Sequence, residues 1–239
     1  MSKELGIVIP IVGPTANFQE FLQELSYVLI RNSIEARIVV IANSAELHLR
    51  REEYQKLQSE NLLDLTCFTS DVDGNGYGRL IRLGIAQLNN KSILIALPDG
   101  TAELELVPKL INSVRQGADL AIVNRYSQEN SKGTPIFQRI FSYSLNWLLP
   151  GKLPQDSTYA FRIFDKALYE SLAVSGTSGD FFAEQSVKTI LCNGAITPID
   201  GKFHQSNDSS LRFKLLPDGF GYVRVLVRTL FHRLGIPWF

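Results

Sequence analysis

A short apolar run that ends in a turn is the feature that most constrains the fold of this chain. Residues 92–101 read SILIALPDGT, so six apolar residues, Ile93 to Pro98, are followed by Asp99 and Gly100. Six residues are too few for a buried helix, but they suit a strand covered on both faces, with the Asp-Gly pair as its turn. In open α/β sheets, ligands bind at this carboxyl end of the strands.

Asp99 and Thr101 offer hard oxygen atoms just after this predicted strand. Such oxygens suit a divalent cation, and a cation is a common means by which a protein holds a pyrophosphate. The alternative interpretation is an ordinary Asp-Gly turn that binds nothing.

Strands and helices alternate along the first part of the chain. Continuous apolar runs predict strands at Leu5–Val12, Ala36–Ala42 and Leu63–Thr69, and helices are predicted over residues 17–29 and 46–60. This β-α-β-α-β order predicts a doubly wound, Rossmann-like α/β fold, with a mostly parallel central sheet and helices on both faces.

Composition excludes several classes of protein. The 239 residues are 45% hydrophobic and 20% charged, with 24 basic and 24 acidic residues, so neither disorder nor nucleic-acid binding is indicated. The two isolated cysteines form no zinc motif or disulfide framework, which favours a reducing, cytoplasmic location. No apolar stretch reaches the roughly 20 residues of a membrane span, and the first residues predict no signal peptide.

Glycines precede the next predicted helix. Residues 71–88 read DVDGNGYGRLIRLGIAQL, in which Gly74, Gly76 and Gly78 come directly before an amphipathic pattern. Glycines at a helix N-terminus let a phosphate approach the backbone, although loop glycines are often plain turns. A further strand, Asp119–Val123, is followed by Arg125, again at the ligand edge of the sheet.

Polar residues in the second half offer further candidates. A helix predicted over Thr134–Leu149 has an apolar face and a second face with Ser142 and Asn146, which is either solvated or part of a site. Asp156 lies six residues before Arg162, as a structural ion pair or as a site acid with its positioning base. Glu184 lies in a predicted helix.

The last 39 residues carry a local net charge of +4. Val223–Leu234 interleaves three arginines with apolar residues, which predicts a basic amphipathic helix in a tail of residues 206–239 that follows a main domain of residues 1–205. Such a helix suits an anionic membrane surface, the chain's own core or a second subunit.

Six segments, taken in order, resemble the family 2 glycosyltransferases of the GT-A fold, and within them the dolichyl-phosphate mannose synthase-like branch, which transfers sugars to polyprenyl phosphates. They are IVIPIVGPTANFQEFLQEL, NGYGRLIRLGIAQL, GADLAIVNRY, RIFSYSLNWLL, DSTYAFR and HQSNDSSL. In this alignment Leu97-Pro98-Asp99 falls on the Asp-x-Asp metal motif of the family, with leucine in place of the first carboxylate. The nucleoside-binding Asp-Asp-Gly-Ser is replaced by residues 41–44, IANS.

The resemblance implies a role for each matched residue. Asp99, assisted by Thr101, is the expected ligand of a divalent cation, Mg or Mn, and Asp156 is the candidate catalytic base. The expected substrate-binding residues are Gly76, Arg125, Ser142, Asn146, Arg162, Glu184 and His204.

The resulting functional hypothesis is an inverting glycosyltransferase. It moves a sugar from a nucleotide sugar to a polyprenyl phosphate or another glycan acceptor at the cytoplasmic membrane face, either alone or as a homo-oligomer. One alternative is a catalytically degenerate GT-A scaffold, favoured by the lost carboxylates. The other is a dinucleotide-dependent oxidoreductase, which the absence of G-x-G-x-x-G disfavours.

Overall fold

A computed structural model describes residues 4–12, 18–43, 64–70, 76–98, 102–125, 136–150, 153–201 and 215–236. Its strands are β1 Leu5–Ile11, β2 Ala36–Asn43, β3 Asp64–Ser70, β4 Ser92–Ile95, β5 Leu120–Asn124, β6 Arg162–Asp165 and β7 Ile196–Asp200. Its helices are α1 Phe18–Arg31, α4 Tyr77–Ala86, α5 Val107–Arg115, α6 Ile136–Leu148, α7 Lys166–Leu172, α8 Asp180–Leu191 and α9 Leu215–Arg233, with a 3-10 turn, η1, at Leu104–Leu106. The helix predicted at residues 46–60 lies outside the described residues.

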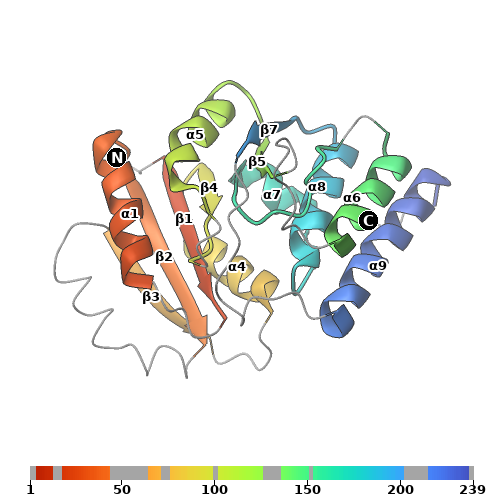
Figure 1. Cartoon of the computed structure of the whole chain (residues 1–239), viewed down its shortest axis with the longest axis horizontal. Helices are drawn as coiled ribbons and strands as arrows, with labels where there is room; N and C mark the ends of the chain where they lie inside the picture. The colour runs from red at the N-terminus through yellow and green to blue at the C-terminus, as the bar shows by residue number, and fades with distance from the viewer. Residues whose placement is uncertain are drawn as a thin grey trace.

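The strands form one sheet in the order β3-β2-β1-β4-β6-β5-β7 (Figure 1). Neighbouring strands are parallel except at β6, which runs antiparallel to both β4 and β5. The chain adds β2 and β3 on one side of β1 and β4 on the other, so right-handed crossovers place α1 and α4 on opposite faces. The predicted doubly wound α/β fold is confirmed, and its switch point lies between β1 and β4.

Apolar periodicity explains the core. Every residue of β1 is buried, as expected for a strand covered on both faces. The buried residues of α1 recur at intervals of three and four along one face. On α4, Gly84 permits close packing, because a Cβ there would lie 2.6 Å from Cγ1 of Val8 on β1.

Helix α9 packs against α6 and α8 at one end of the molecule (Figure 1). Tyr222 and Val225 of α9 are buried in a second apolar cluster with Phe141 of α6, and the rings of Phe141 and Tyr222 meet edge to face at 4.6 Å between centroids. The C-terminal helix therefore docks on the chain's own core, one of the three predicted alternatives. Among the described helices, none is long and apolar enough to cross a membrane.

Candidate functional site

The antiparallel strand β6 decides which residues meet at the ligand edge of the sheet. Arg162, its first residue, pairs with Ile95 of β4 and with Ile122 of β5. Because β6 runs the opposite way, the segment that precedes it lies at the same edge as the carboxyl ends of β4 and β5. This segment, residues 156–161, therefore meets Arg125, which directly follows β5.

Arg125 and Asp156 form a buried bidentate ion pair at this edge. Arg125 Nε lies 2.5 Å from Oδ2 of Asp156 and Nη2 lies 3.0 Å from Oδ1, while the two residues are 7% and 0% exposed. The hydroxyl of Thr158 also donates to Oδ1, at 3.3 Å. Among the described residues, Asp156 pairs with Arg125 and not with Arg162, so the suggested Asp156–Arg162 ion pair is wrong.

The guanidinium of Arg125 is fixed on a second side by an aromatic ring. Its Cζ lies 4.1 Å from the centroid of Tyr159, a distance typical of a cation–π contact. The two hydrogen bonds to Asp156 and the contact with the Tyr159 ring together hold this cation in one orientation. Two nitrogens of this cation are bonded to Asp156, and the substrate-binding role of Arg125 stays a prediction.

Arg162 is fully buried and anchors the segment 156–161 to α8. Its nitrogens donate to the carbonyl oxygens of Ser157, Tyr159 and Phe182. The shortest nitrogen–oxygen distances to these three carbonyls are 3.1, 2.5 and 2.9 Å. Side-chain oxygens of Gln185 and Ser186 accept at 3.3 and 3.1 Å. Burial lowers the pKa of Arg162 to about 9, against the opposing attraction of Asp156, so it stays protonated at neutral pH.

A second polar cluster joins the N-terminus of α4 to residues 175–178. The backbone N–H of Gly78 donates to the carbonyl of Thr177 at 3.1 Å, and Arg82 donates to the carbonyl of Gly176. A Cβ at Gly76 would lie 2.0 Å from that Thr177 oxygen. Gly76 is therefore required by packing, and its substrate-binding role stays a prediction.

The buried carboxylate of Glu184 on α8 also contacts the segment 175–178. Its carboxylate accepts from the backbone N–H groups of Ser175 at 3.2 Å and Gly176 at 2.7 Å, and Lys188 Nζ lies 2.9 Å away. Burial alone would raise the pKa of Glu184, but Lys188 and Ser175 outweigh it, so the pKa lies below its usual range. Glu184 is thus a buried structural carboxylate in the described part of the chain.

A pH titration of stability tests this network. A carboxylate whose pKa is lower in the folded than in the unfolded state stabilises the fold above the unfolded pKa, and this contribution is lost as the pH falls through the folded value. We expect the free energy of unfolding of the wild type to fall with acidification below about pH 4.5, the usual value for such a group. Glu184→Gln should be less stable at neutral pH and should lose less on acidification, as measured by urea unfolding across pH.

Helix α6 places Ser142 in the interior. Ser142 is 2% exposed, and its Oγ has no hydrogen-bond partner among the described residues. Asn146 donates to the carbonyl oxygens of Ser142 at 3.1 Å and Pro154 at 3.4 Å, which joins α6 to the segment before Asp156. The solvated alternative for this face is therefore wrong for Ser142.

The predicted metal ligands, Asp99 and Thr101, lie outside the described residues, as do His204 and Gly74. Leu97, which occupies the position of the missing carboxylate, is half-buried and packs against the main apolar core. Within the described ranges no three His, Cys, Asp or Glu residues cluster as metal ligands would. The role of Asp99 and Thr101 as metal ligands therefore stays a prediction.

Sequence reasoning missed the residues that fix the candidate ones in place. Thr158 and Tyr159 lie within the DSTYAFR segment, where Thr158 donates to the neighbouring Asp156, whereas the ring of Tyr159 contacts Arg125, which follows a different strand. Asp180, whose Oδ2 lies 2.7 Å from Nη2 of Arg224, was likewise not singled out. Only the alignment of β5 beside β6 could have indicated the contact between Tyr159 and Arg125.

No known protein-family profile matches the chain. Glucosyl-3-phosphoglycerate synthase of Mycobacterium tuberculosis, solved with UDP, superposes with a TM-score of 0.68 at 16% identity, over 98% of this chain and 81% of that one. A further structure of that enzyme gives a TM-score of 0.70 at 15% identity, over 98% and 82%. The chain has the GT-A fold.

One curated protein is similar in sequence over most of the chain. It is the low-salt glycan biosynthesis hexosyltransferase Agl6 of Haloferax volcanii, 22% identical over 229 residues, or 93% of this chain. The chain spans about half of that protein, 53% of its length.

Proposed function

We propose that this GT-A-fold chain is a glycosyltransferase that moves a sugar from a nucleotide sugar to a phosphate-bearing acceptor. The observation that carries the proposal is the oriented, buried Arg125 at the ligand edge of a GT-A sheet. The similarity to a hexosyltransferase supports it. So does a solved GT-A neighbour that binds Mn²⁺, UDP-glucose and phosphoglyceric acid, with a TM-score of 0.66 at 16% identity over 98% of this chain and 81% of that one.

In this mechanism Arg125 stabilises phosphate charge while an acceptor oxygen attacks the anomeric carbon from the face opposite the leaving nucleoside diphosphate, with inversion. Asp156 was predicted as the catalytic base, but both of its oxygens accept hydrogen bonds from neighbours. We propose instead that it positions Arg125. A phosphate acceptor is already ionised at neutral pH and needs no base to deprotonate it.

The acceptor we propose is a polyprenyl phosphate at the cytoplasmic membrane face, as in the dolichyl-phosphate mannose synthase-like branch. The described face formed by α6 and α9 supports a lipid acceptor, because it exposes large apolar side chains. Asp99 and Thr101 remain the residues we propose for Mg or Mn, which solved neighbours bind together with UDP.

A degenerate scaffold is the second candidate, and Leu97 favours it. This residue packs against the core where the family motif carries a carboxylate. Calorimetric titration with UDP and GDP, with and without Mn²⁺, separates the two candidates. Binding followed by transfer of labelled sugar to polyprenyl phosphate supports the enzyme, whereas no binding of either nucleotide supports the scaffold.

The variant Ser142→Ala tests whether the buried hydroxyl of Ser142 contacts the substrate. Because the hydroxyl has no described partner, its removal should leave the melting temperature unchanged or slightly higher. If it contacts substrate, transfer should fall by about tenfold, the value of one hydrogen bond of about 1.4 kcal/mol. Ser113→Ala is the matched control on α5, since among the described residues the hydroxyl of Ser113 donates to the carbonyl of Lys109 in its own helix. Equal transfer by both variants would remove Ser142 from the site.

A further inference from the structure

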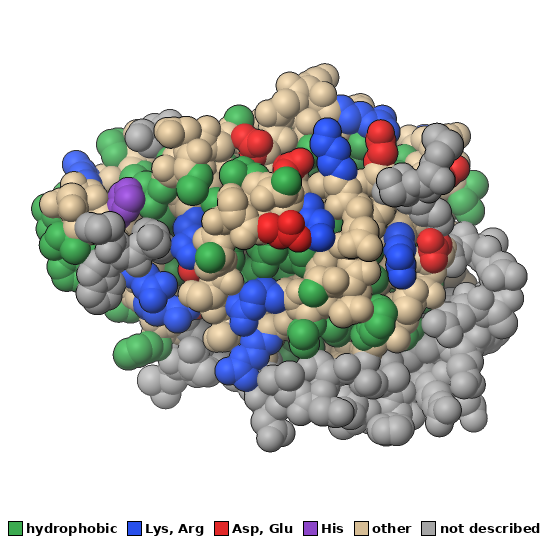
Figure 2. All heavy atoms as spheres, turned by 180° about the vertical axis from the view of Figure 1, so that it is seen from behind, with side chains coloured by type: hydrophobic (Ala, Val, Ile, Leu, Met, Phe, Trp, Pro, Cys, Tyr) green, Lys and Arg blue, Asp and Glu red, His purple; other side chains and the backbone are tan. Residues whose placement is uncertain are grey.

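Large apolar side chains gather on one end of the molecule. Nine of the twelve exposed large hydrophobic residues in the described ranges lie on α6, α9 and the residues just after α9, which concentrates them in one place. Those nine define the α6–α9 face: Ile140, Tyr143, Trp147, Phe220, Val223, Val227, Leu230, Leu234 and Ile236. In Figure 2 this end of the molecule is at the left, where hydrophobic and basic side chains meet.

The exposed apolar residues on α9 and just after it form a regular stripe along the helix. Phe220, Val223, Val227, Leu230 and Leu234 follow intervals of three and four, so they share one side of the helix. The core-facing side is separate and is formed by Tyr222, Val225 and Thr229. Helix α9 is therefore apolar on two sides, of which the fold covers only one.

Ion pairs fix the rotation of α9 that leaves this stripe outside. Arg224 Nη2 lies 2.7 Å from Asp180 Oδ2, and Arg228 Nη1 lies 3.9 Å from Glu184 Oε1, both on α8. An anionic membrane surface was one of the partners predicted for this helix, but the structure turns these two arginines toward buried carboxylates. The apolar stripe is thus held outward by the fold itself.

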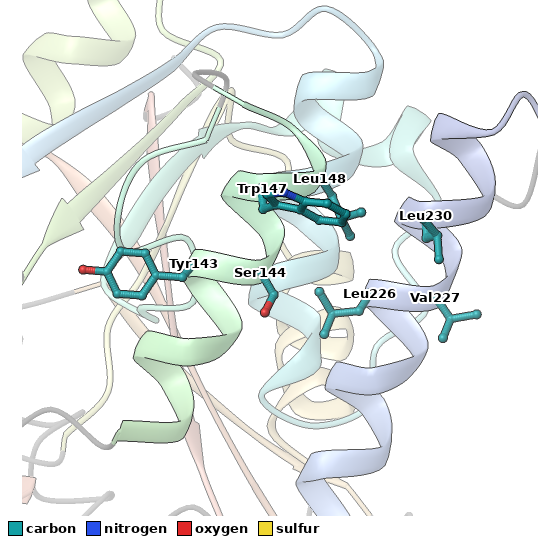
Figure 3. Close-up of a pocket in the computed structure, with 7 residues that line it drawn as sticks. All are labelled: Tyr143, Ser144, Trp147, Leu148, Leu226, Val227 and Leu230. Carbon is teal, nitrogen blue, oxygen red and sulfur yellow. The ribbon is translucent and has the colours of Figure 1, made fainter.

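Helix α6 completes the surface. Trp147 is 72% exposed, and a groove of about 550 Å³ runs between it and Leu226, Val227 and Leu230 of α9 (Figure 3). Arg233 links the ends of the two helices, because its Nη1 donates to the carbonyl of Trp147 at 2.9 Å and its Cζ lies 5.6 Å from the indole ring.

Charge identifies what covers this face. The described side chains of α6 and α9, residues 139–148 and 219–233, include four arginines and one histidine but no acidic residue. Arg224 and Arg228 are paired with carboxylates of α8, so Arg139 and Arg233 remain as the cations of this face. Two copies joined symmetrically through this face would bring like charges together, which disfavours a dimer. Anionic headgroups match these charges, and the interfacial region of a bilayer suits tryptophan, tyrosine and phenylalanine.

We propose that the α6–α9 face docks on an anionic lipid bilayer, with Trp147 and Phe220 in the interfacial layer and Arg139 and Arg233 beside the headgroups. The bilayer meets two helices rather than the C-terminal helix alone. This inference rests on the lipid acceptor of the proposed function. Membrane docking is measured without sugar transfer, so docking can fail while the transfer activity holds, and the reverse.

Vesicle flotation of the full chain tests docking. We expect binding to vesicles that contain phosphatidylglycerol, weaker binding at high salt and little binding to pure phosphatidylcholine. The triple variant Trp147→Ser, Phe220→Ser, Leu234→Ser should bind at least about tenfold less. Tyr27→Ser with Ile30→Ser, which removes exposed apolar residues of α1, is the matched control and should bind as the wild type does.

A second measurement leaves the residues of the α6–α9 face unchanged. With Trp238→Phe, Trp147 is the only tryptophan, and brominated anionic lipids should quench its fluorescence. Unquenched fluorescence, or equal flotation of the wild type and the triple variant, would overturn the proposal. So would a wild type that fails to float but sediments as a dimer that the triple variant splits, because the face would then join two copies.

Discussion

Asp156→Asn is expected to lower the free energy of unfolding by about 3 to 5 kcal/mol, because it leaves the buried guanidinium of Arg125 without its counter-charge. For a chain of this size each kcal/mol lowers the melting temperature by roughly 2 to 4 °C, so a fall of roughly 10 °C is expected in thermal unfolding. Sugar transfer should fall as well, since Arg125 loses the carboxylate that orients its guanidinium.

A double-mutant cycle isolates the pair. Arg125→Met alone leaves Asp156 buried without a cation, so it should destabilise to a similar degree, while the double variant should recover part of the loss. Thr158→Val is the control, since it removes one neutral donor to Asp156 and should cost about 1 kcal/mol. If Asp156→Asn melts with the wild type but transfers no sugar, the pair is not a structural element and Asp156 acts in catalysis, as the sequence alone suggested.

The first half of the fold was predictable because the local sequence pattern identifies its strands. β1 and β2 are buried on both faces and read as continuous apolar runs, whereas β6 and β7 do not. β6 is four residues long and begins and ends with charged residues, and the edge strand β7 is only partly buried. Their conformation depends on neighbouring strands, so a local pattern does not reveal them.

The candidate site was predictable as a set of residues but not as a set of contacts. Arg125 and Asp156 were each singled out, yet their pairing depends on the antiparallel course of β6, which the sequence did not predict. Similarly, the sequence left open whether the basic helix α9 meets a membrane, the chain's own core or a second subunit, because Asp180 and Glu184 lie on a helix that precedes α9 by more than 20 residues. Sequence spacing identifies such groups, and only the tertiary fold decides which charges meet.

Arg162→Met should destabilise the protein, although it removes a buried charge. Desolvation of the guanidinium costs several kcal/mol, which is why its pKa is lowered to about 9, and relief of that cost favours methionine. Against it, the protein loses the hydrogen bonds from the guanidinium to the carbonyl oxygens of Ser157, Tyr159 and Phe182, although the hydroxyl of Ser186 still donates to those of Ser157 and Phe182. The loss of these charge-assisted hydrogen bonds outweighs the relief of desolvation, so we expect a net loss of about 2 to 4 kcal/mol in urea unfolding.

Arg162→Lys separates the charge from the hydrogen bonds. Lysine keeps the cation, but its three donors radiate from one atom and cannot reach all the acceptors that lie around the edges of the guanidinium group. It should therefore be no more stable than methionine at this position. Suppose instead that Arg162→Met melts at or above the temperature of the wild type while sugar transfer is lost. The fold then does not need this arginine, and a buried cation retained at an energetic cost points to the substrate-binding role that the family resemblance implied.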